Sequence, residues 1–145
     1  MTVYFFQSRS MDGLAGDRVW RVEAEKGQQA TVLLADGTKV RLNAESSLSY
    51  RQNYGIKDRE VELKGEGFFE VAKEEEKPFI VRTSLLDVEV LGTVFNVYAY
   101  DCEEIVEMSL ISGRIKVMTH TDPVQTVYLK PNEKILYNKE SEIWR

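Results

Sequence analysis

The fold of this protein is decided by residues 59–71, which read REVELKGEGFFEV. From Glu60 to Lys64 charged and apolar residues alternate with a period of two. Successive side chains of an extended strand point to opposite faces, so Val61 and Leu63 are predicted to face a core and the charges to face solvent. Gly65 then interrupts the run and predicts a tight turn.

The same alternation recurs along the rest of the chain. The segments are Thr38–Leu42, Asp87–Val90, Arg114–Val117 and Val127–Leu129. They are rich in β-branched and aromatic residues, which suit a pleated surface with one face buried. No window of about a dozen residues keeps a helical stripe, and Glu70–Lys77 reads as a solvated connection that ends at Pro78. The sequence therefore predicts an all-β protein.

Turn residues separate these segments at fairly even spacing. Asp36-Gly37 between two apolar runs predicts a hairpin, because glycine tolerates the positive φ of a tight turn. The pattern around Gly65, Gly92 and Gly113 is similar and suggests a degenerate repeat of strand, turn and strand, although hairpins of similar length would give the same spacing. Such a repeat suits stacked antiparallel strands, in a two-sheet sandwich or a short β-helix-like body.

The chain of 145 residues predicts one domain. Residues 1–26 form a poorly patterned N-terminal segment, and residues 27–145 are expected to form the β domain, densest from Gly27 to Tyr137. No stretch approaches the roughly 20 apolar residues of a membrane span. The apolar run Val3–Phe6 is too short for the core of a signal peptide.

Composition argues against several classes of function. The net charge is −5, from 19 basic and 24 acidic side chains interspersed along the chain, so we expect no nucleic-acid partner. With one histidine and one cysteine, neither a site of several imidazoles nor an intramolecular disulfide can form. We therefore expect no metal and no cofactor.

The sequence offers no assembled catalytic site. Glu66 and Glu70 would share a face of a strand at about 13 Å, too far apart for the carboxylate pair of a glycosidase. Glu74–Glu76 reads as solvated surface. Cys102 lies between acidic residues, which disfavour a reactive thiolate. No nucleophile elbow, P-loop or dinucleotide fingerprint is present, and we expect no enzyme activity.

Aromatic residues leave one alternative open, a carbohydrate-binding β-sandwich module. Four phenylalanines are predicted to lie in the core, namely Phe68, Phe69, Phe79 and Phe95. Tyr54, Tyr98 and Tyr100 are candidates for a sugar-stacking platform, which would require exposed, coplanar rings. A third interpretation, a cupin-like enzyme, would need about three histidines for its metal.

Seven stretches in chain order resemble a known family. They are Leu34–Ala44, Ser47–Tyr50, Arg59–Val71, Lys77–Val81, Val90–Val97, Gly113–Val117 and Leu129–Glu133. Together they resemble the FecR-like family, in the form found in Bacteroidetes-type regulators. Gly67 stands where the family usually has alanine, and Asn132 where it usually has glycine. Both residues suit turns or close packing.

The resemblance implies structural roles for the residues of its motifs, with glycines at turns and asparagines bonded to backbone. These residues are Asp36, Gly37, Asn43, Gly65, Glu66, Phe69, Pro78, Phe79, Gly92, Thr93, Phe95, Asn96 and Gly113. None of them is predicted to be a catalytic, metal-binding or cofactor-binding residue.

The resemblance also implies a function and a place in the cell. The chain would be the periplasmic middle portion of a single-pass inner-membrane anti-sigma regulator, and residues 1–26 would follow the membrane anchor. A TonB-dependent outer-membrane transporter, carrying an iron chelate or a glycan, would signal to the regulator through a signalling domain. In the family a small C-terminal α+β domain meets the transporter, and this chain would lack that domain. A cytoplasmic segment would hold or release an extracytoplasmic-function sigma factor. An exposed strand edge could accept a partner strand by β-augmentation.

Overall fold

The computed structural model of the protein describes residues 18–140 and 143–144, the latter pair as backbone only. The described residues form strands and no helix, which confirms the all-β prediction. The strands are β1 (Val19–Ala24), β2 (Ala30–Leu33), β3 (Lys39–Leu42), β4 (Ser46–Arg51), β5 (Arg59–Glu70), β6 (Phe79–Arg82), β7 (Leu86–Val90), β8 (Val94–Ala99), β9 (Ile105–Ser112), β10 (Ile115–Thr119), β11 (Thr126–Leu129), β12 (Lys134–Asn138) and β13 (Ile143–Trp144).

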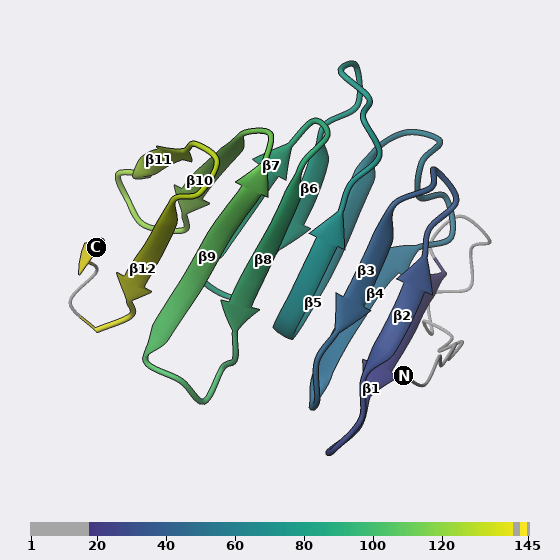
Figure 1. The fold of residues 1–145 in the computed structure, drawn as a ribbon, viewed down its shortest axis with the longest axis horizontal. Coiled ribbons are helices and arrows are strands. Elements are labelled where there is room, and N and C mark those ends of the chain that lie inside the picture. The colour runs from purple at the N-terminus through teal and green to yellow at the C-terminus, as the bar shows by residue number, and fades with distance from the viewer. Residues whose placement is uncertain (1–17, 141–142, 145) are drawn as a thin grey trace.

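The strands form one 13-stranded sheet that folds over into two facing layers (Figure 1). One layer has the order β1-β4-β5-β6-β7-β10-β11, and the other has the order β2-β3-β5-β8-β9-β12-β13. Neighbouring strands are antiparallel except β5 and β6, which are parallel. Because β5 belongs to both layers, the sheet is nearly closed and barrel-like. It is therefore not a clear sandwich of two separate sheets.

Strand β5 passes from one layer to the other at Gly65. Residues before Gly65 pair with β4 and β6, whereas residues from Gly65 onward pair with β3 and β8. Gly65 has a φ of 100°, which bends the strand without reversing the chain. The predicted turn at Gly65 is therefore wrong, and so is the strand–turn–strand repeat at this position. Val61, Leu63 and Phe69 remain on the same buried face across the bend.

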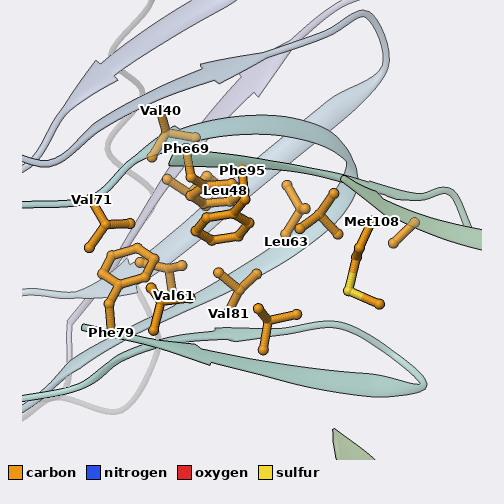
Figure 2. Close-up of a cluster of buried hydrophobic side chains, with 14 of the residues drawn as sticks. Val40, Leu48, Val61, Leu63, Phe69, Val71, Phe79, Val81, Phe95 and Met108 are labelled. Carbon is orange, nitrogen blue, oxygen red and sulfur yellow. The ribbon is translucent and has the colours of Figure 1, made fainter. Parts of the chain in front are cut away.

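The core lies between the two layers and is centred on phenylalanines (Figure 2). Phe69 and Phe95 are cross-strand partners whose rings stack 5.0 Å apart at 8°. Phe79, from the other layer, meets Phe69 edge-on at 6.0 Å. The prediction that these three residues lie in the core is confirmed. The same prediction is wrong for Phe68, because the alternation of side chains along β5 places Phe68 on the outer face. There the Arg41 guanidinium lies 4.9 Å from the centre of the Phe68 ring.

The paired sheet begins at Val19, inside the segment 1–26 that the sequence places before the β domain. Residues 1–17 of that segment lie outside the described residues. Strand β1 pairs with β4 along its length, and Val22 and Ala24 are buried. The alternation from Trp20 to Ala24 was the available signal for this strand. β1 and β2 also contact each other, so the two layers meet at this end.

Candidate interaction site

Several motif residues surround Arg59, whose side chain is fully buried at the start of β5. Its guanidinium donates a hydrogen bond to Asp36 Oδ2 at 3.0 Å and lies 5.8 Å from the ring centre of Phe79. Its other hydrogen bonds go to backbone carbonyl oxygens, those of Ala72 (2.7 Å), Glu74 (3.2 Å), Lys77 (2.7 Å) and Leu91 (3.0 Å). Arg59 thereby ties the 71–78 connection and the β7–β8 turn to the core.

Asp36 completes this buried cluster from the β2–β3 turn. Its carboxylate accepts hydrogen bonds from the backbone N–H of Thr38 (3.1 Å), the Thr38 hydroxyl (2.9 Å) and the Tyr54 hydroxyl (3.0 Å). Burial alone would raise the pKa of Asp36, but the hydrogen bonds from Arg59, Thr38 and Tyr54 outweigh it and lower the pKa below its usual value. Burial raises the pKa of Tyr54, and the nearby Asp36 carboxylate adds to the increase.

The lowered pKa of Asp36 predicts an acid-sensitive part of the stability. Asp36 stabilises the fold above its unfolded-state pKa, near 3.8, and this contribution is lost as the pH falls through the lower pKa of the folded state. We expect the urea midpoint of the wild-type chain to fall more between pH 6 and pH 3 than that of the Asp36→Asn variant. The variant should also be less stable at pH 6. Circular dichroism follows the urea unfolding at each pH. If the urea midpoints of the two proteins fell equally between pH 6 and pH 3, Asp36 would not be the source of the acid sensitivity.

A second group of motif residues meets on the outer face of the layer that contains β8. Glu66 of β5 accepts hydrogen bonds from the amide groups of Asn43 and Asn96, each at 2.9 Å and each on a different carboxylate oxygen. This clamp joins the end of β3 to β5 and β8. An open groove of about 270 Å³ lies beside it, also lined by Arg41 and Phe68. The clamp joins one carboxylate to two amides, so it is not the carboxylate pair of a hydrolase.

The remaining motif residues lie at turns and strand ends. Gly37 lies in the β2–β3 turn, and Pro78 directly precedes β6. Thr93 donates a hydrogen bond from its hydroxyl to the Arg114 carbonyl at 3.0 Å, which joins the β7–β8 and β9–β10 turns. At these two turns Gly92 and Gly113 allow a close approach of the chains. A Cβ on Gly113 would lie 2.8 Å from the Gly92 carbonyl oxygen.

A histidine, a serine and two aspartates approach one another without forming a nucleophilic triad. His120 Nε2 lies 2.9 Å from Asp87 Oδ1, but Nδ1 faces the backbone carbonyl of Ser84 at 3.2 Å. The Ser84 hydroxyl instead donates to Asp101 at 2.9 Å. His120 is therefore not hydrogen-bonded to the Ser84 hydroxyl as the base of a catalytic triad would be. Cys102 is exposed, and the described residues contain no group of three or more potential metal ligands.

The tyrosines do not form a flat platform for sugars. Tyr54 is buried beside Phe79, with its hydroxyl on Asp36. Tyr98 and Tyr100 lie 4.9 Å apart, but their rings are inclined at 67°. The Tyr100 hydroxyl is held by the Ala44 carbonyl at 2.7 Å. These residues therefore lack the coplanar arrangement that the carbohydrate-binding alternative requires.

A wider groove, of about 730 Å³, lies beside the edge strand β11. Two exposed apolar residues contribute to it, Leu91 from the β7–β8 turn and Tyr128 from β11. Charged side chains also line it, namely Lys73, Glu75, Glu89, Arg114 and Lys116, together with the uncharged residues Val90, Gly92, Thr93, Gly113 and Ile115. We call this feature the β11 groove. Sequence reasoning missed it, because its walls come from four separate segments of the chain.

Comparisons with known proteins give a consistent result. A family model described as "FecR protein" matches residues 20–116. Two crystal structures described as a "putative anti-sigma factor" from Parabacteroides distasonis have similar folds. One is 37% identical with a TM-score of 0.82, and it covers 88% of this chain and 58% of that chain. The other is 38% identical with a TM-score of 0.80, covering 86% and 57%.

This chain spans less than two thirds of the Parabacteroides chains, so those proteins contain much that has no counterpart here. No curated protein matches the sequence. Within the described range, no helix has the length and apolar character needed to cross a membrane.

Proposed function

This chain belongs to the FecR protein family, and from that premise we propose that it is the periplasmic relay domain of a membrane-bound anti-sigma regulator. In this proposal it receives a signal from a TonB-dependent outer-membrane transporter and controls an extracytoplasmic-function sigma factor. The observation that carries the proposal is the match, over 88% of the chain, to a structure described as a "putative anti-sigma factor". Membrane attachment and sigma-factor binding belong to segments outside the β domain.

The arrangement of side chains supports a regulatory role over a catalytic one. The buried Arg59 cluster and the Glu66 clamp have their polar groups satisfied within the protein. Ser84 and His120 are not joined as nucleophile and base. A relay requires a different property, a rigid body whose surface binds a partner with different affinity in two states. The nearly closed sheet, in which β11 pairs with a strand on one side only among the described residues, fits that requirement.

The proposal predicts selective binding to a protein. The periplasmic part of the regulator, this chain included, is immobilised and incubated with the purified periplasmic signalling domains of the TonB-dependent transporters encoded beside its gene, and with unrelated signalling domains as controls. We expect one of the neighbouring domains to bind saturably. If none binds and the chain is instead retained on a glycan array, the relay proposal is wrong and the carbohydrate-binding module replaces it.

A further inference from the structure

His120 joins the 120–125 connection between β10 and β11 to the β6–β7 turn. Its backbone N–H donates to the Leu85 carbonyl at 3.0 Å. Its imidazole Nδ1 lies 3.2 Å from the Ser84 carbonyl oxygen, and Nε2 lies 2.9 Å from Asp87 Oδ1. We call the imidazole of His120, the Ser84 carbonyl and the Asp87 carboxylate the His120 clasp. It connects two segments that are more than thirty positions apart along the chain.

Both atoms that face the imidazole nitrogens are hydrogen-bond acceptors. A backbone carbonyl oxygen cannot donate, and neither can an ionised carboxylate. Asp87 forms an ion pair with Arg82, whose Nη1 lies 2.8 Å from Asp87 Oδ2. A neutral imidazole has one N–H and can donate to only one of the two acceptors, whereas the charged imidazolium donates to both. The His120 clasp is therefore complete only when His120 carries a positive charge.

Charged and titratable groups surround the clasp from several elements, namely Asp87, Arg82, Glu60, Asp101, Lys139 and Asp122. In the described part of the chain, Asp87 is the group in ion-pair contact with the imidazole. Asp101, in the β8–β9 turn, is linked to the clasp through the Ser84 hydroxyl at 2.9 Å. Lys139 donates to the Asp101 carbonyl at 3.2 Å. A change of charge at His120 therefore acts first on Asp87.

We propose that the His120 clasp is a pH-sensitive device, which holds the β10–β11 connection to the β6–β7 turn when the imidazole is charged and loosens the connection when the imidazole is neutral. A histidine side chain changes its charge between about pH 5 and 8. The stability that the second hydrogen bond contributes is present at the acidic end of this window and is lost as the pH rises. The inference goes beyond the proposed function and does not depend on it.

Urea unfolding at pH 5.5 and at pH 8 compares the wild-type chain with His120→Gln, whose side-chain amide is neutral at both. The chain contains one histidine, so this substitution removes the only imidazole while every other titrating group is kept. Between the two pH values we expect the wild-type urea midpoint to fall by about 0.5 M more than that of the variant. This difference follows from the typical strength of one hydrogen bond and the usual slope of urea unfolding.

Ser84→Ala is the matched control. It removes the hydroxyl that donates to Asp101 but keeps the backbone carbonyl that faces Nδ1 of His120. This variant should therefore keep the pH dependence of the wild-type chain, even where its stability is lower at both pH values. Circular dichroism establishes that each variant is folded before the urea midpoints are compared.

Hydrogen exchange of the wild-type chain shows whether the connection itself loosens. The His120 N–H donates to the Leu85 carbonyl, and the Gln125 N–H donates to Thr119 Oγ1 at 2.9 Å. The Asn132 N–H, which donates to the Leu110 carbonyl at 2.8 Å, provides a reference outside the connection. Protection factors, which are corrected for the intrinsic effect of pH, should fall from pH 5.5 to pH 8 at residues 120 and 125 but not at Asn132.

Two results would each overturn the pH-sensitive device. One is a urea midpoint that changes equally with pH in the wild-type chain and in His120→Gln. The other is protection at residues 120 and 125 that stays constant between pH 5.5 and pH 8, a measurement that requires no variant. Neither result involves a signalling domain, so failure of the His120 clasp is distinguishable from failure of the proposed relay.

Discussion

Replacing Gly65 by alanine is expected to destabilise the protein by about 3 kcal/mol or more, from left-handed backbone strain and overpacking together. The φ of 100° at this position is strained for any residue with a Cβ. A Cβ there would also lie 2.3 Å from Ser46 Oγ and 2.9 Å from Ser46 Cα. Ser46 cannot simply turn away, because its hydroxyl accepts the Glu66 N–H at 2.9 Å and contacts Tyr100.

Urea unfolding followed by tryptophan fluorescence measures this effect, with Gly27→Ala as the control. Gly27 has a positive φ of 75°, but a Cβ added there meets nothing within 4 Å. The control should therefore show the backbone strain alone, about 1–2 kcal/mol. If the two variants lost similar free energies of unfolding, the close approach of Gly65 to Ser46 would not be required where β5 passes between the layers.

Replacing Arg59 by methionine is expected to cost about 3–5 kcal/mol, the usual range when one partner of a buried ion pair is removed. Methionine fills part of the space but leaves the Asp36 carboxylate without its cation and several backbone carbonyl oxygens without the Arg59 donor. Arg59→Lys keeps the charge yet lacks the planar fork that reaches several acceptors, so it should recover only part of the loss.

Arg82→Met provides a matched control for the Arg59 variant. Arg82 also forms ion pairs, with Glu60 and Asp87, but its side chain is 49% exposed. Solvent-exposed pairs typically contribute less than about 1 kcal/mol, so urea unfolding should show a small effect. If Arg59→Met and Arg82→Met were equally destabilising, burial of the Arg59 cluster would not be the source of its contribution.

Much of the strand pattern could be predicted from the sequence because alternation is a local property. The burial of Val61, Leu63 and Phe69 on the same face of β5 follows directly from a period of two. The behaviour of Gly65 could not be predicted in the same way. A glycine in a turn and a glycine in a bent strand look alike in sequence, and the distinction depends on Ser46 in a neighbouring strand.

The clusters of polar side chains depend on topology, which local patterns do not contain. Glu66 bonds to Asn43 and Asn96, which lie 23 and 30 positions away along the chain. The burial of Arg59 could be predicted locally, because residues 59, 61 and 63 share one face of a strand. A charged residue on the face of Val61 and Leu63 must point into the core and requires buried partners. The identity of those partners depends on how the 71–78 connection folds back onto β5.

The most direct test of the proposed relay is a saturation titration of the regulator's periplasmic part, this chain included, with the signalling domains of the neighbouring transporters, measured by calorimetry. We predict saturable one-to-one binding to one of them. Signalling domains of unrelated transporters should not bind. Absence of heat and of saturation with every neighbouring signalling domain would contradict the assignment of this chain as a sensor of the transporter.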